Sequence, residues 1–185
     1  MNKADFYRVV RAKLGKLTAD QVTGIDYILA AAVPSVPLAH AAYMLATAWH
    51  ETNKTMLPVR EAYWLNEAWR KTHLRYYPWY GRGYVQITWD YNYRRADDEL
   101  GLKGRLVADA ELAMVPSIAA AIMRRGMEEG WFTGVKLSAV LPSRSPATRE
   151  QYMNARTIIN GHDKADLIED YAQAFEAALI EGKWA

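Results

Sequence analysis

From Tyr27 to His50 the chain contains no Asp, Glu, Lys or Arg. A stretch of this length without a charge is typical of a segment buried in a protein core or in a membrane. Pro34 and Pro37 interrupt it and it carries His40, so we expect no membrane span. The segment should instead pack into the core of a globular domain, and 185 residues are enough to build one.

Apolar residues at helical spacing dominate both ends of the sequence. Thr18, Pro37 and Pro116 are typical helix-start residues, and we expect Asp163 to cap the last helix. The predicted helices cover residues 4–14, 19–31, 38–51, 117–129 and 148–159, followed by that last helix. The 38–51 helix has an apolar stripe and, opposite it, a more polar one that we expect to line a cavity. The polar stripe consists of His40, Tyr43, Thr47 and Glu51.

Composition excludes several classes of protein. The net charge of +2 is too small to indicate nucleic-acid binding. The chain has no cysteine, which excludes disulfides and cysteine-based metal sites, and its four histidines show no metal-ligand spacing. We therefore expect no metal and no cofactor. The first residues lack the apolar core of a signal peptide, so we expect synthesis in the cytoplasm.

The middle of the chain has a different character. Between residues 53 and 92 the helical periodicity fails, and YVQIT (residues 84–88) is the only run that resembles a strand. Residues 63–93 hold half of the aromatic side chains, and all of these are Tyr or Trp. Such side chains offer an apolar face and a hydrogen-bonding edge, which suits sugar rings. The alternative is an aromatic-rich core beneath long loops.

Two carboxyl groups are the usual requirement for hydrolysing a glycosidic bond. Glu51 follows the uncharged segment at the end of a predicted helix. Low polarity and the negative helix end should raise its pKa and suit it to donate a proton. Glu61 follows a loop containing Pro58 and can return across a cleft, and Glu67 is the competing choice for the second carboxylate. Taken singly, a Glu at a helix end such as Glu51 is more often a solvated surface residue, and an exposed charge is the alternative for Glu61 and the favoured reading for Glu67.

Three segments together resemble the family 19 glycoside hydrolases, which include plant-type chitinases, bacterial relatives and phage endolysins. They are His50–Thr52, the long block Tyr80–Tyr93 (YGRGYVQITWDYNY), and Ile158–Gly161. The resemblance implies a mainly α, lysozyme-like bilobal fold with a small irregular or β segment around GRGYVQIT. It also implies one catalytic domain over 1–185, with residues 1–35 as an N-terminal helical leader packed on it.

The resemblance also implies roles for individual residues. Glu51 matches the general acid and Glu61 the general base of an inverting mechanism, and Thr88 matches the hydroxyl that helps to hold the attacking water. Arg82 either pairs with a carboxylate or fixes the loop between its two glycines. The candidate substrate-binding residues are His50, Tyr80, Arg82, Gln86, Trp89, Asn92 and Asn160.

We therefore expect a monomeric endolysin that hydrolyses the β-1,4 bonds of peptidoglycan. It would be made in the host cytoplasm and act on the cell wall after release, with glycan strands as its only partner. The residue run GKLTADQVTGID, which resembles the leader of such lysins, and the mild positive charge favour this over a chitinase. A non-catalytic glycan-binding module and a lytic transglycosylase remain alternatives, which product analysis would separate.

Overall fold

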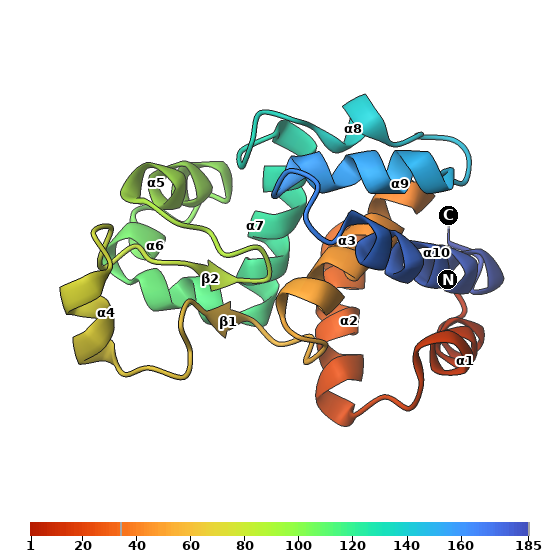
Figure 1. Ribbon diagram of the computed structural model, residues 1–185, viewed down its shortest axis with the longest axis horizontal. Helices are drawn as coiled ribbons and strands as arrows, with labels where there is room; N and C mark the ends of the chain where they lie inside the picture. The colour runs from red at the N-terminus through yellow and green to blue at the C-terminus, as the bar shows by residue number, and fades with distance from the viewer. Residues whose placement is uncertain (34, 185) are drawn as a thin grey trace.

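The computed structural model describes residues 1–33 and 35–184, and it is built mainly of helices (Figure 1). The longer helices are α1 (Lys3–Leu14), α2 (Ala19–Ala32), α3 (Leu38–Glu51), α5 (Asp90–Glu99), α7 (Pro116–Glu129) and α10 (Ala165–Glu181). The shorter ones are α4 (Glu67–His73), α6 (Arg105–Ala108), α8 (Leu137–Val140), α9 (Arg149–Ala155) and the 3₁₀ turns η1 (Ala110–Met114) and η2 (Arg156–Ile158). A two-stranded antiparallel sheet pairs β1 (Val59–Arg60) with β2 (Arg82–Gly83). The predicted mainly α fold with a small β segment is confirmed.

Two lobes lie on either side of α7 (Figure 1). The helical lobe contains α1, α2, α3, α8, α9 and α10, with α10 packed along α3 and α1 packed on α10. The aromatic lobe contains α4, α5, α6, η1 and the small sheet. Helix α7 contacts α2 on one side and β2 and η1 on the other. Helix α7 therefore packs against elements of both lobes.

The predicted helix starts are largely confirmed. The Thr18 side chain accepts a hydrogen bond from the Gln21 backbone, and Gln21 returns one to Thr18. Pro116 occupies the first position of α7. The prediction for Asp163 is wrong, because α10 begins after Lys164, which is left-handed with φ 59°. The Asp163 carbonyl instead accepts a hydrogen bond from Arg156.

Helix α3 is buried on all sides, so the predicted cavity-lining stripe is wrong for three of its four residues. His40, Tyr43 and Thr47 are all buried, and the His40 ring lies 3.3 Å from the Leu141 carbonyl. Burial raises the pKa of Tyr43 to about 12. The uncharged segment is covered by α10 as well as by α2, which leaves only the end of the helix, at Glu51, open to a cleft.

The predicted strand at YVQIT is also wrong. Residues 84–86 form a turn, which two backbone hydrogen bonds between Arg82 and Ile87 close. Tyr84, Val85 and Ile87 are all buried, whereas a half-buried strand would expose alternate side chains. Gln86, with φ 54°, allows the chain to turn within this short distance. The apolar run thus fills the lobe interior as a compact loop.

The loop after α3 rests directly on α2. Met56 is fully buried, and its backbone nitrogen donates to the Thr52 hydroxyl oxygen. Gly24 in α2 permits this approach, since a Cβ atom there would lie only 1.8 Å from the Met56 carbonyl oxygen. Gly24 therefore allows the segment between Glu51 and Glu61 to pack closely against α2.

A Gly24→Ala variant is expected to be less stable by about 2–3 kcal/mol, because helix or loop must move to accept the methyl group. That loss corresponds to a fall in Tm of roughly 5–10 °C for a chain of this size, measurable by thermal circular dichroism. Thr23→Ala, on the exposed side of the same helix, is the matched control and should change little. A Gly24→Ala protein as stable as the wild type would contradict the close packing.

Candidate active site

A cleft of about 1010 Å³ brings together the two predicted carboxylates. Glu51 reaches it from the end of α3 and Glu61 from the residue after β1. Glu67 and Glu111, from the aromatic lobe, line the same cleft. Within the described residues, no helix is long and apolar enough to cross a membrane, and no group of His, Asp and Glu side chains is arranged to hold a metal ion.

Glu51 is held by an arginine from a distant part of the chain. The Arg156 Nη1 atom donates to Glu51 Oε1 at 2.8 Å, across 105 residues of sequence. Arg156 is almost fully buried, and its Nε atom also donates to the Asp163 carbonyl. The predicted low-polarity surroundings of Glu51 are therefore wrong, since the Arg156 guanidinium lies in direct contact with its carboxyl group. The second oxygen, Oε2, has no hydrogen-bond partner among the residues that the structure describes.

Glu61 is positioned by extension of the small sheet. Its backbone nitrogen donates to the Gly81 carbonyl at 2.7 Å, and the Gly81 nitrogen donates to Glu61 Oε2 at 2.9 Å. The Tyr76 hydroxyl donates to Oε1 at 2.5 Å. Burial, followed by the bond to Glu61, raises the pKa of Tyr76 to about 12, so this hydroxyl remains a donor at neutral pH. Two neutral donors, the Tyr76 hydroxyl and the Gly81 backbone N–H, thus hold the two oxygens of the Glu61 carboxyl group.

A side chain at position 81 would crowd Gln86 and the Glu61 carboxyl group. A Cβ atom there would lie 2.7 Å from Gln86 Oε1 and 3.2 Å from Glu61 Oε2. The first glycine of the GRG motif thus serves to bring a backbone N–H against the Glu61 carboxylate.

Glu67 has a different environment from Glu61. Its Oε2 atom accepts hydrogen bonds from Arg70 Nη1 at 3.2 Å and from the Tyr80 hydroxyl at 3.0 Å. Arg70 is buried and also donates to the Glu61 and Ala62 carbonyls. Glu67 therefore belongs to the scaffold that holds the segment around Glu61, although it lines the same cleft.

Arg82 has both of the roles that the sequence left open. It is buried, its Nη1 atom donates to the Pro78 and Tyr80 carbonyls, and its Nε atom donates to Glu111 Oε1 at 2.8 Å. Its guanidinium also lies 3.5 Å from the centre of the Tyr80 ring. Arg82 thus fixes the loop and pairs with a carboxylate, but that carboxylate is Glu111, which sequence reasoning missed.

Glu111 joins two arginines at the cleft. Besides Arg82, it accepts from the Arg60 guanidinium. Burial alone would raise the pKa of the Glu111 carboxyl, but the hydrogen bonds from Arg60 and Arg82 outweigh it and hold the pKa below its usual value. The group therefore stabilises the fold above its unfolded-state pKa of about 4.3, and this contribution is lost as the pH falls through the lower folded-state value.

A Glu111→Gln variant is expected to lose about 1–2 kcal/mol of unfolding free energy at pH 7. The difference from the wild type should shrink below about pH 4, where the wild-type carboxyl is protonated too. Urea unfolding of both proteins between pH 3 and pH 7 measures this. A difference that stays constant across that range would show that the carboxylate charge does not stabilise the fold.

The other predicted site residues occupy varied positions, and their roles remain predictions. Gln86 lines the cleft, and its side chain donates to the Val59 carbonyl. The Thr88 hydroxyl donates to the Gln86 carbonyl at 2.8 Å, and the Asn92 amide donates to the Thr88 carbonyl at 2.9 Å. These three residues thus form one hydrogen-bonded chain, of which Gln86 lines the cleft and Thr88 and Asn92 do not.

Seven predicted residues do not line this cleft: Arg82, Thr88 and Asn92, described above, and Tyr80, Trp89, Asn160 and His50. The Tyr80 ring is buried, and the Arg70 and Arg82 guanidinium groups lie 5.4 and 3.5 Å from its centre. Trp89 lies at 5.0 Å from the Tyr76 ring, and Asn160 is exposed. His50 is half-buried beside Glu51, and burial lowers its pKa, so that the neutral ring dominates at neutral pH.

Comparisons with known proteins place the fold. No protein-family model matches the chain, and no curated protein matches it. Among solved structures, chitinase C from Streptomyces griseus HUT6037 aligns with a TM-score of 0.61 at 20% identity, over 98% of this chain and 76% of that one. A bacterial family 19 chitinase aligns with a TM-score of 0.55 at 20% identity, over 96% of this chain and 94% of that one. The chain therefore has the fold of the bacterial family 19 chitinases.

Proposed function

We propose that this protein hydrolyses β-1,4 bonds between N-acetylated sugars by an inverting, two-carboxylate mechanism. The observation that carries the proposal is the presence of Glu51 and Glu61 in one cleft, on a fold shared with chitinases. Each is held by its own partners, Glu51 by Arg156 and Glu61 by Tyr76 and Gly81. Fixed carboxylates in a cleft large enough for a glycan are what this chemistry requires.

The mechanism gives the two carboxylates opposite tasks. Glu51 donates a proton to the leaving glycosidic oxygen as the bond to the anomeric carbon breaks. Glu61 removes a proton from a water that attacks this carbon from the opposite face. Arg156 holds Glu51 Oε1 in place, which leaves Oε2 to carry the proton. A water between the carboxylates requires a separation of roughly 6.5–9.5 Å, and the first product is the α-anomer.

Peptidoglycan is the substrate that we favour. The resemblance of the run GKLTADQVTGID to the leader of phage endolysins and the net charge of +2, which suits an anionic cell wall, support this choice. The protein would then act in host lysis as a monomer, reaching the wall through a membrane pore made by another protein. Chitin is the second candidate, because the solved structures that share the fold are chitinases.

Product analysis tests the function and separates the candidates. The purified protein is incubated with bacterial cell walls and with N-acetylglucosamine oligomers, followed by mass spectrometry and proton NMR of fresh products. We expect turbidity loss of the walls and fragments that end in a reducing sugar, with the α-anomer formed first. Faster cleavage of chitin oligomers would make the protein a chitinase. A 1,6-anhydro product would indicate a transglycosylase, and the absence of any product would indicate a binding module.

A further inference from the structure

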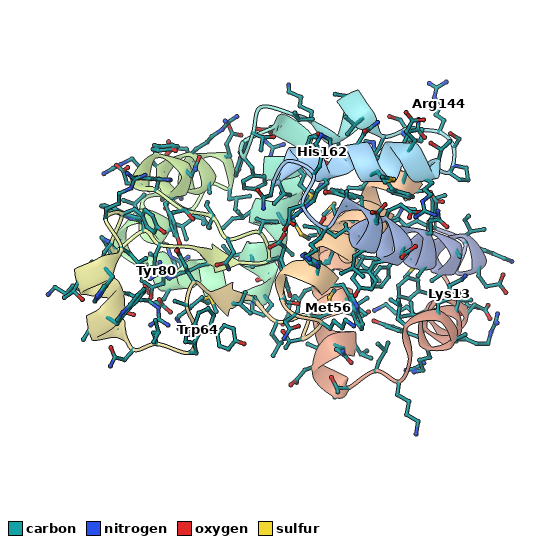
Figure 2. All side chains as sticks on the ribbon, viewed as in Figure 1. Lys13, Met56, Trp64, Tyr80, Arg144 and His162 are labelled. Atoms are coloured by element: carbon teal, nitrogen blue, oxygen red, sulfur yellow. The ribbon has the colours of Figure 1, made fainter. Side chains whose placement is uncertain are left out.

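Two aromatic residues next to the predicted general base are unusually exposed. Trp64 has 72% of its surface accessible and Tyr63 has 64%, the highest values among the large hydrophobic side chains of the described residues. Both line the cleft that holds Glu51 and Glu61. Figure 2 shows Trp64 at the lower margin of the aromatic lobe, below Tyr80. Side chains of this size are normally buried, so their exposure in a cleft points to a ligand.

The backbone beneath the two rings is firmly held. Leu65 N donates to the Ala62 carbonyl at 2.9 Å, which closes a turn around Tyr63 and Trp64. The buried Arg70 guanidinium donates to the same Ala62 carbonyl at 2.9 Å and to the Glu61 carbonyl at 3.0 Å. One arginine thus fixes the turn and the carboxylate-bearing residue together. Arg70 therefore fixes the positions of the two rings relative to Glu61.

The geometry of the pair suits a sugar. The ring centroids lie 5.2 Å apart with an interplanar angle of 84°, so the edge of one ring meets the face of the other. The arrangement combines an exposed indole with a phenol hydroxyl beside it. A pyranose ring has a face of C–H bonds that stacks on an aromatic surface and hydroxyls at its edge that accept and donate hydrogen bonds. Leu57 and Pro58 add apolar surface along the same cleft.

We propose that Tyr63 and Trp64 form a sugar-binding platform for a β-1,4-linked N-acetylated glycan, beyond the sugars that flank the cleaved bond. Trp64 stacks on a pyranose face, and the Tyr63 hydroxyl meets the sugar edge. The platform holds a long glycan strand so that one of its glycosidic bonds lies at Glu51 and Glu61. The proposal rests on the function proposed above, and it adds a subsite that binds substrate without taking part in proton transfer.

Binding measurements in a Glu51→Gln background test the platform without cleavage. Calorimetry with the N-acetylglucosamine hexamer and with a soluble peptidoglycan tetrasaccharide is carried out on this parent and on versions that also carry Trp64→Ala or Trp64→Phe. We expect Trp64→Ala to weaken binding of the preferred glycan about tenfold or more, and Trp64→Phe to restore part of it. In the otherwise wild-type protein, Trp64→Ala should raise KM for long strands and leave kcat nearly unchanged.

Tyr27→Ala is the matched control, because Tyr27 is 40% exposed on α2 and lies outside the cleft lining. It should bind as the parent does. Thermal unfolding shows whether each variant folds. We expect the Trp64 variants to fold, because the Trp64 side chain is highly exposed. Undiminished binding by Trp64→Ala would overturn the platform while leaving the catalytic proposal intact. Binding that depends on Trp64 without any cleavage by the wild type would support the platform and overturn the catalytic proposal. If the parent bound neither glycan, both would fall.

Discussion

A Glu51→Gln variant is expected to lose roughly 10³-fold of the glycan-cleaving rate and to keep its fold. The amide cannot supply the proton that the leaving oxygen needs. Its oxygen can still accept the hydrogen bond that Arg156 Nη1 donates at 2.8 Å, so the local geometry should be kept. The rate is measured as reducing-end formation on cell walls and on chitin oligomers, with circular dichroism to check the fold.

The Glu51→Gln change also has a predictable structural side effect. It removes the negative partner of an arginine that is only 3% exposed, so some loss of thermal stability is expected. Assays well below the variant's Tm separate this effect from the chemical one. A folded variant that retained more than a tenth of the wild-type rate would exclude Glu51 as the general acid.

A Glu61→Gln variant is expected to lose about 10²- to 10⁴-fold in kcat, because a neutral amide cannot take a proton from the attacking water. Substrate binding should change much less, so the loss should appear in kcat more than in KM. Azide offers a further measurement, since this small anion attacks without being deprotonated. Added azide should restore part of the rate of Glu61→Gln and none of the rate of Glu51→Gln.

Glu67→Gln is the matched control for this second prediction. Glu67 lines the same cleft and undergoes the same chemical change, but its Oε2 atom is engaged by Arg70 and Tyr80. We expect this variant to stay within a few-fold of the wild-type rate. The reverse order, with Glu67→Gln inactive and Glu61→Gln active, would identify Glu67 as the base.

Local signals in the sequence were sufficient for most of the helical lobe. Thr18 and Pro116 start helices through contacts within a few residues, and the spacing of apolar residues is also a local property. The aromatic lobe could not be predicted in this way. Its strands are only two residues long, and the buried run Tyr84–Ile87 is shaped by what surrounds it. From the sequence alone, a short apolar run of this kind cannot be distinguished from a strand.

In the site, too, residues with a local sequence signal could be predicted, whereas their partners from distant parts of the chain could not. Glu51 and Glu61 stand ten positions apart in the sequence, and the uncharged segment pointed to the first of them. Their partners Arg156 and Tyr76 could not be inferred, because nothing in their local sequence distinguishes them from other arginines and tyrosines. Glu111 was missed for the same reason, although its two arginine partners make it part of the cleft.

Because Arg156 orients Glu51, the arrangement of the cleft depends on a segment far along the chain from both predicted carboxylates. A nascent polypeptide that has emerged only as far as η1 already contains every cleft-lining carboxylate, but it lacks the guanidinium that orients Glu51. Arg156 is itself anchored to the carbonyl of Asp163, just before α10, and α10 must dock on α3 to complete the lobe. Chains that stop before Arg156, or before α10, should therefore lack glycan-cleaving activity even though they contain Glu51 and Glu61.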